Sequence, residues 1–193
     1  MPRLTAASGR PRVDGKKPQP EQFEQLRVVF SETRIHKRVA RMAHSIDRDY
    51  YGRTLHLVGQ LENSFVFVAD LIRMLKVPVT CHFLRSVVHD RTWHGIPIRQ
   101  ISYWPGVELH GKDVLLVDGV LETGVTMDFL LNSIQGQNPS SVRMAALIEK
   151  VHHKKVSVAP DYVGFETRKS YLVGYGLGHA GRYRNLPYIA AIG

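Results

Sequence analysis

The sequence predicts one α/β domain in which a mostly parallel central sheet is flanked by helices. Two observations predict it: strand-like apolar runs alternate with helical patterns, and neither a linker nor an internal repeat divides the chain. The chain has 193 residues, of which 44% are hydrophobic and 22% are charged. This length suffices for one domain with a proper core and would be crowded for two. Alternating strands and helices imply parallel pairing with right-handed crossovers.

The first half of the domain begins with a helical pattern over residues 21–50. The pattern is interrupted at residues 31–34, where Ser31 or Thr33 can serve as an N-cap. Residues 54–60 have the pattern of a strand, and residues 61–64 that of a turn. An apolar helix is predicted over residues 65–76, where Pro78 ends it, and the next strand covers residues 79–84.

The second half begins with residues 85–111, which have no clean period and form either a loop or an irregular hairpin. A segment of this length inside a compact domain is usually functional. Residues 114–118 form a short apolar run that ends in an acid, which is typical of a buried parallel strand. A helix is predicted over residues 127–134, and strands over residues 142–148, 162–165 and 171–175.

The first twenty residues are predicted to be a basic disordered tail, which leaves residues 21–193 for the domain. The tail has four prolines and five basic residues against one acid, Asp14, and almost no large apolar side chain. The whole chain carries 26 Lys and Arg against 17 Asp and Glu, a net charge of +9, so the domain keeps about five of these charges. This surplus suits an anionic ligand such as a phosphate or nucleotide, and a solvated basic surface explains it as well.

Several other function classes find little support in the sequence. No run of about 18 apolar residues is present, so no membrane span is expected, and the first residues lack the apolar core of a secretory signal. The single cysteine, Cys81, cannot form an internal disulfide and is interpreted as a packed thiol in a reducing cytoplasm. The histidines have no recognisable zinc spacing. Nucleic-acid binding through the basic tail is one more hypothesis, although the sequence has no helix-turn-helix or RNA-recognition signature.

The segment with the clearest chemistry runs from Lys112 to Leu131, where an apolar strand leads into a short loop and the loop into a helix. Ligands bind at the carboxyl ends of parallel strands, so the loop Glu122-Thr123-Gly124-Val125-Thr126 should face a crevice. The amide groups at a helix start are unsatisfied, Gly124 allows close approach, and the two threonines add hydroxyl donors. The loop therefore predicts a site for a dianionic phosphate, with ordinary turn-and-cap chemistry as the alternative.

This segment resembles the phosphoribosyl-pyrophosphate motif of type I phosphoribosyltransferases. It is most similar to the hypoxanthine-guanine branch, in which four apolar residues, two acids and two apolar residues precede Asp-Thr-Gly-x-Thr. The resemblance covers roughly residues 26–192 and implies the type I fold with a small hood and a flexible loop. The other stretches that resemble the family are its helix after the pyrophosphate loop (residues 67–71), its purine-site strands (160–166 and 171–175) and its arginine-bearing segment (182–186).

The resemblance implies roles for the residues around the sugar. The 5′-phosphate would lie on the loop from Glu122 to Thr126. Glu122 stands where the family has an aspartate and is the candidate general base toward the purine N7. Asp118 would bind the ribose hydroxyls and help to hold Mg²⁺, and Arg184 would stabilise the leaving pyrophosphate.

The resemblance also implies a base site and partners. Tyr171 would stack on the purine, with Leu172 beside the base edge and Lys150 nearby. A plain strand aromatic is the alternative for Tyr171, and a solvated strand end is the alternative for Lys150. The expected small-molecule partners are phosphoribosyl pyrophosphate or a nucleoside monophosphate and a purine base. The family also implies a homo-oligomer, either a dimer or a tetramer.

The sequence departs from the family pattern at several positions, which leaves two functions open. One is an enzyme that transfers 5-phosphoribosyl from phosphoribosyl pyrophosphate to a purine, with Mg²⁺. The other is a catalytically degenerate paralogue that binds a nucleotide 5′-phosphate as a regulatory or partner subunit. The departures are Glu62 for the lysine of a loop with a non-proline cis bond, Gly119 for the second acid, Ala159 for a lysine that reads the 6-oxo group, Gly178 for an aspartate at the second magnesium, and Ser86-Val87 for Ser-Tyr.

Overall fold

The computed structural model describes residues 25–93, 96–103, 106–169 and 171–193. The predicted tail over residues 1–20 lies outside the described residues. The elements in chain order are β1 (Leu26–Phe30), α1 (Glu32–Asp49), β2 (Leu55–Leu61), α2 (Phe65–Met74), β3 (Val79–Trp93), β4 (Ile96–Tyr103), β5 (Asp113–Leu121), α3 (Val125–Gln135), β6 (Ser141–Lys150), β7 (Tyr162–Thr167), β8 (Leu172–Val173) and β9 (Ile189–Ile192).

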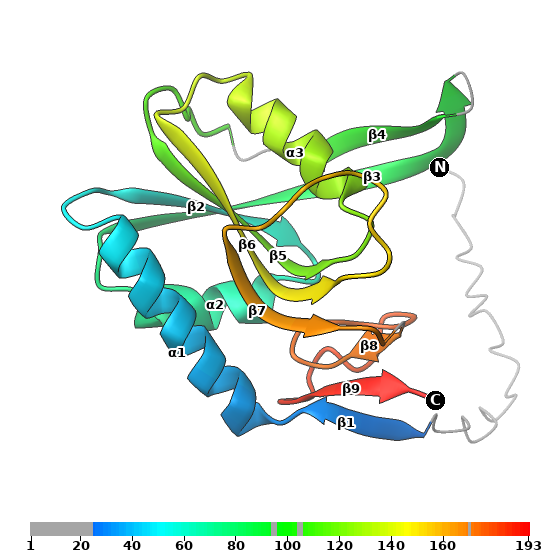
Figure 1. Cartoon of the computed structure of the whole chain (residues 1–193). Coiled ribbons are helices and arrows are strands. Elements are labelled where there is room, and N and C mark those ends of the chain that lie inside the picture. Colours follow the sequence, from blue (N-terminus) through cyan, green and yellow to red (C-terminus); the bar gives the residue numbers. More distant parts are fainter. Residues whose placement is uncertain (1–24, 94–95, 104–105, 170) are drawn as a thin grey trace, which may run out of the picture.

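The central sheet has the order β4-β3-β2-β5-β6-β7. Strands β3, β2, β5, β6 and β7 are parallel, and β4 pairs with β3 in the antiparallel direction. Helices α1 and α2 cover one face of this sheet and α3 covers the other (Figure 1). The predicted fold class is therefore confirmed. Because β2, β5 and β6 run the same way, their carboxyl ends and the loops that follow them share one edge.

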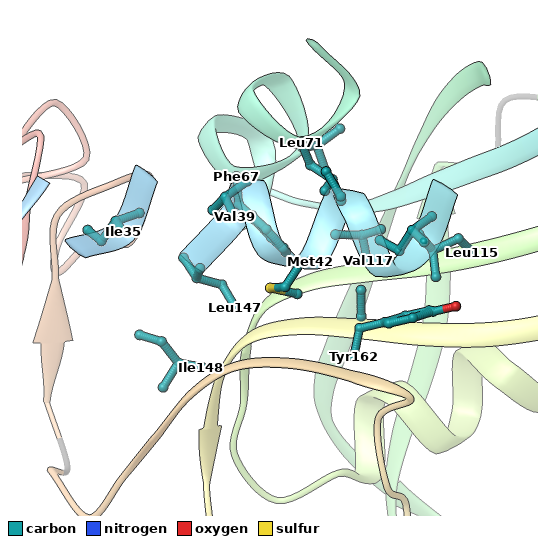
Figure 2. Packing of buried hydrophobic residues seen from close by; sticks show 14 of the residues in the cluster. Ile35, Val39, Met42, Phe67, Leu71, Leu115, Val117, Leu147, Ile148 and Tyr162 are labelled. Atoms are coloured by element: carbon teal, nitrogen blue, oxygen red, sulfur yellow. The ribbon is translucent and has the colours of Figure 1, made fainter. Parts of the chain in front are cut away.

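The larger core lies between the sheet and helices α1 and α2. The apolar residues of α1 recur at helical spacing, which gives the helix one buried face. Phe67 of α2 and Leu115 of β5 are fully buried against that face (Figure 2). Each fully buried side chain of this size contributes about 1.5–3 kcal/mol of hydrophobic stabilisation. The buried residues of α1 are Ile35, Val39, Met42, Ala43 and Ile46.

A second core lies under α3. Met127, Leu130 and Ile134 are buried on one side of this helix. They belong to the same cluster as Val58 of β2 and Leu116 of β5. Because β5 contributes buried side chains to both cores, it is apolar on both faces, as the short apolar run predicted. The loop that follows β5 is thus attached to the most buried part of the sheet.

A small antiparallel sheet of order β1-β9-β8 forms the hood beside the central sheet. The prediction of a helix from residue 21 was wrong here, because residues 26–30 form β1 and α1 begins only after Ser31, one of the two predicted caps. Val28 is exposed while Phe30 is buried and stacks on Phe165 at 4.2 Å between ring centroids. Pairing with β9, from the other end of the chain, overrides the local pattern.

Three further predicted segments have different residue bounds in the structure. The segment after residue 84 is a hairpin, because β3 continues to residue 93 and pairs with β4 through two register shifts. Strand β5 continues past Asp118 to Leu121. The strand predicted over residues 171–175 has only two residues, because Gly174, Tyr175 and Gly176 have positive φ angles that end it. None of the helices in the described part of the chain is long and apolar enough to span a bilayer.

Candidate phosphate and base site

The loop after β5 has the strand-loop-helix geometry that the sequence predicted. Residues 122–124 form a bend, and α3 begins at Val125 with Gly124 as its N-cap. Gly124 has a φ of 79°, in the left-handed region, and an added Cβ would lie 2.9 Å from Val156 Cγ2. The amide of Lys155 donates to the carbonyl oxygen of Thr123 at 2.9 Å, which fixes the loop against the next segment. Glycine is therefore required by both conformation and space.

A cavity of about 220 Å³ opens above this loop. Glu122, Thr123, Gly124 and Thr126 line it, whereas Val125 does not. Thr126 stands in the first turn of α3, where amide groups lack acceptors inside the helix and carry the positive end of its dipole. Neither threonine is buried out of reach, since both are half-buried. The cavity thus combines amide and hydroxyl donors around a space that suits a phosphate.

Asp118 lines the same cavity from the strand below the loop. Its side chain is only 8% exposed, and burial raises the pKa of this carboxyl group to about 7. Two amide hydrogens, from Gly119 and Val120, donate to the carboxylate and oppose that shift. At neutral pH Asp118 is therefore divided between its neutral and ionised forms, so a ligand that donates hydrogen bonds or carries positive charge would favour ionisation.

A second cavity of about 180 Å³ lies beside the first. Lys150, Tyr171 and Leu172 line it, so the structure brings the three predicted base-site residues together. Lys150 is 5% exposed, and its Nζ lies 2.8 Å from Glu122 Oε1. The alternative of a solvated strand end for Lys150 is thereby wrong. Tyr171, by contrast, is 68% exposed, although it lines the same cavity.

The two cavities share part of their lining: Asn63, Val120 and Glu122 contribute to both. One has hydroxyl and amide donors, and the other has a buried cation and an exposed aromatic ring. A ligand that carries a phosphate at one end and a planar heterocycle at the other therefore matches the pair of cavities. Glu122 lies at the junction, half exposed, with its carboxylate held by Lys150.

Arg184 lies at the rim and not in the lining of either cavity. Its guanidinium donates to Asn63 Oδ1 at 2.9 Å and to the carbonyl oxygen of Gly176 at 2.6 Å. Arg184 Nη2 also lies 3.3 Å from Glu62 Oε2. The predicted contact of Arg184 with a leaving pyrophosphate would therefore compete with an internal carboxylate. The peptide bond between Leu61 and Glu62 is cis, as the resemblance implied for this loop.

The other departures have different surroundings. Gly119 faces the Leu61–Ser64 loop so closely that an added Cβ would overlap the backbone oxygen of Asn63. At Gly178, an added Cβ would lie 2.9 Å from Arg184 Cζ. Ala159 is exposed and lines neither cavity. The cation in the lining of the second cavity is Lys150, from the end of β6.

Four residues at the site were not singled out as contributors by sequence reasoning. Asn63 lines both cavities, and His179 lines the second. Gln60 donates to Ser86 Oγ at 2.8 Å, while its buried amide oxygen has no hydrogen-bond partner in the described part of the chain. Arg85 contacts Glu62. The signal for Gln60 and Asn63 was available, because both lie where β2 ends, next to the strand that carries the phosphate loop.

The side chains of this site could hold a magnesium ion only with the help of other ligands. In the described ranges, no group of three or more His, Cys, Asp or Glu side chains could hold a metal by itself. Asp118 is the acid buried in the phosphate cavity, and glycines stand at positions 119 and 178. Magnesium commonly uses one or two carboxylates together with substrate phosphates and water. Asp118 is therefore the buried carboxylate of this cavity that could hold a magnesium ion together with oxygen atoms of a ligand and water.

Comparison with known proteins gives one consistent result. Residues 29–179 match the model of the phosphoribosyl transferase domain. A hypoxanthine-guanine phosphoribosyltransferase of Dictyostelium discoideum is 32% identical over 169 residues, which cover 86% of this chain and 94% of that protein. A hypoxanthine phosphoribosyltransferase of Haemophilus influenzae is 31% identical over 171 residues, again 86% of this chain and 94% of the relative.

Solved structures agree with the sequence relatives. A hypoxanthine-guanine phosphoribosyltransferase from Bacillus anthracis superimposes with a TM-score of 0.77 at 31% identity, over 88% of this chain and 99% of that one. A hypoxanthine phosphoribosyltransferase from Trypanosoma cruzi, solved in complex with the product IMP, has a TM-score of 0.81 at 27% identity, over 91% and 98% of the two chains. The likeness thus extends over nearly the whole described fold.

Proposed function

Because this chain belongs to the phosphoribosyltransferase family, we propose that it transfers 5-phosphoribosyl from phosphoribosyl pyrophosphate to a purine of the hypoxanthine or guanine type. The observation that carries the proposal is the pair of adjoining cavities, one with phosphate donors and one with Lys150 and Tyr171. The relatives named above act on hypoxanthine or guanine, which supports the same class of base.

The proposed reaction assigns one task to each side chain. The loop from Thr123 to Thr126 holds the 5′-phosphate, and ionised Asp118 accepts hydrogen bonds from the ribose hydroxyls. The bond between the ribose C1 and the diphosphate oxygen breaks, its electron pair leaves with diphosphate, and a purine nitrogen bonds to C1. The purine loses one proton in this exchange, which we assign to the Glu122 carboxylate. A magnesium ion, when bound with Asp118 as a ligand, would neutralise charge on the leaving diphosphate.

A turnover assay tests the proposal. Purified protein with phosphoribosyl pyrophosphate, Mg²⁺ and a panel of purines should form nucleotide and diphosphate in equal amounts, with hypoxanthine or guanine as the best acceptor. Lys150 can donate to a 6-oxo group, and adenine has a donor amine at that position. Preference for adenine would contradict the proposed base class. Absence of product with every base would contradict the enzyme.

The second candidate function is nucleotide binding without turnover, in a regulatory or partner subunit. It is favoured by Glu62, which contacts Arg184 at the rim, and by the absence of acidic side chains at Gly119 and Gly178. Under this alternative a nucleoside 5′-monophosphate binds at a ratio of one per chain while the turnover assay yields no nucleotide. Binding and turnover measured on the same preparation separate the two functions.

Replacing Tyr171 with alanine should weaken binding of a purine nucleotide about five- to tenfold, the lower part of the range for aromatic stacking on a base. We expect a loss of affinity at the low end of this range because Tyr171 is 68% exposed, so a base stacked on it would remain open to water on one side. Tyr51→Ala is the matched control, since that ring is 87% exposed and lines neither cavity. Equal affinities of both variants for IMP, measured by calorimetry, would contradict the stacking role.

A further inference from the structure

The carboxylate of Glu62 lies between two arginines at the rim of the site. Glu62 Oε1 is 3.3 Å from Arg85 Nη2, and Oε2 is 3.3 Å from Arg184 Nη2. Half of the Glu62 side chain is exposed, so the cluster is open to solvent and to a ligand. One acid thus holds two guanidinium groups that come from β3 and from the segment before β9.

This cluster adjoins the place where a nucleotide would lie. Asn63, the residue after Glu62, lines both cavities and accepts a hydrogen bond from Arg184. Lys150 is the one Lys or Arg among the described lining residues of the two cavities, and it contacts Glu122. Arg85 and Arg184, which meet at Glu62 beside Asn63, are two further cations that could hold a second anionic group on the sugar.

Two glycines accommodate this arrangement. The loop Leu61–Ser64 approaches Gly119 so closely that no side chain fits there without moving the backbone of Asn63. The Arg184 side chain packs on Gly178, where an added Cβ would come within 2.9 Å of the Arg184 Nε and Cζ atoms. The residues at positions 62, 119 and 178 thus lie in one cluster. Within this cluster Arg184 packs on Gly178 and points toward Glu62 and Asn63.

From these contacts we propose that Glu62 is an internal competitor for a diphosphate group: its carboxylate occupies the Arg85–Arg184 pair and must be displaced before those arginines can hold the substrate's second anion. The proposal rests on the proposed function, because it takes the two cavities as the nucleotide site. It predicts that free diphosphate binds weakly to this protein, whereas a nucleoside 5′-monophosphate, which does not need the arginine pair, binds without this penalty.

The test compares magnesium diphosphate and IMP as ligands of Glu62→Gln and of the unchanged protein, by calorimetry. The amide keeps the shape of the side chain and removes its charge, so the Kd for magnesium diphosphate should fall roughly tenfold or more while the Kd for IMP stays within about twofold. Glu62→Lys should tighten diphosphate at least as much. Glu166→Gln, an acid-to-amide change at an exposed position of β7, is the control and should leave both constants unchanged.

The outcomes separate the two proposals. If IMP binds and Glu62→Gln and Glu62→Lys bind diphosphate no more tightly than the unchanged protein, the competitor role is wrong while the nucleotide site stands. Looser diphosphate binding by the amide variant would also overturn it, because Glu62 would then serve to position the arginines or a metal. If none of the proteins binds IMP, the proposed function itself fails. Tighter diphosphate binding with unchanged IMP binding supports the inference.

Discussion

Thr126→Asp is expected to reduce the affinity of the protein for a nucleoside 5′-monophosphate by about a hundredfold or more. The new carboxylate would stand in the first turn of α3, inside the cavity that the proposed function gives to a dianionic phosphate. Two unit charges about 4 Å apart repel by about 4 kcal/mol at an effective dielectric constant near 20. Thr126 is half-buried, so solvent screens part of this repulsion, and the loss of the hydroxyl donor adds to it.

The same substitution should leave the fold intact, which makes the result interpretable. An acid in the first turn of a helix interacts favourably with the positive end of the helix dipole. The thermal unfolding midpoint of Thr126→Asp should therefore equal or exceed that of the unchanged protein. Ser140→Asp is the matched control, because it adds the same charge at an exposed position before β6, at the opposite edge of the sheet. Unchanged nucleotide affinity in Thr126→Asp would contradict a phosphate site in this cavity.

Asp118→Asn is expected to stabilise the protein at neutral and alkaline pH. Burial raises the pKa of Asp118 from 3.8 to about 7, so between these two values the folded protein keeps a proton that the unfolded chain has lost, and above about pH 7 the folded protein must bury the ionised carboxylate. The contribution of Asp118 to stability therefore falls as the pH rises from about 4 to about 7, and it is constant above that range. The shift corresponds to about 4 kcal/mol, since each pKa unit is about 1.4 kcal/mol. Asparagine carries no such cost.

Urea unfolding of both proteins between about pH 4 and pH 8, with EDTA present, measures this effect. The difference in the free energy of unfolding should be near zero at the acid end and should grow in favour of asparagine until about pH 7. The same variant should bind IMP less tightly by about 1.5–3 kcal/mol, because an ionised acceptor for the ribose hydroxyls is lost. A pH-independent difference in stability would show that Asp118 is ionised throughout, contrary to its burial.

The phosphate loop and the parallel sheet could be predicted because their signals are local. The strand, the bend and the helix from Asp113 to Gln135 follow one another within a short stretch, and each carries its own pattern. The bounds were less accurate where backbone geometry ended or prolonged an element. Strand β8 is short because three successive residues have positive φ, two of them glycines, and β5 is long because Val120 and Leu121 continue its ladder with β6.

The features that sequence reasoning missed depend on distant partners. Strand β1 forms because Ile189–Ile192 pairs with it from the far end of the chain. Lys150 is buried because Glu122, from the neighbouring loop, neutralises it, and a strand-end lysine gives no sign of this. The position of Ala159 could be judged only once the structure showed it outside both cavities. Glu62 was recognised as a charge reversal, but its two arginine partners come from separate parts of the sequence.

Departures from the family pattern that are far apart along the chain lie close together in the structure. Three of them, Glu62, Gly119 and Gly178, meet around Asn63 and Arg184, whereas Thr123 and Thr126 line the first cavity and Lys150 lines the second. The change is therefore concentrated where a second anion would bind, and the affinity for diphosphate is the property that it should affect most. The dimer or tetramer expected from the family remains a prediction for solution measurement.

A crystal structure of the protein with bound IMP tests the central claim most directly. We expect the phosphate oxygens within about 3 Å of the Thr123–Thr126 amide and hydroxyl groups, with the purine against Tyr171 and its 6-oxo group toward Lys150. A phosphate that binds elsewhere, with the loop after β5 making no contact to the nucleotide, would contradict the phosphate site and the function proposed from it.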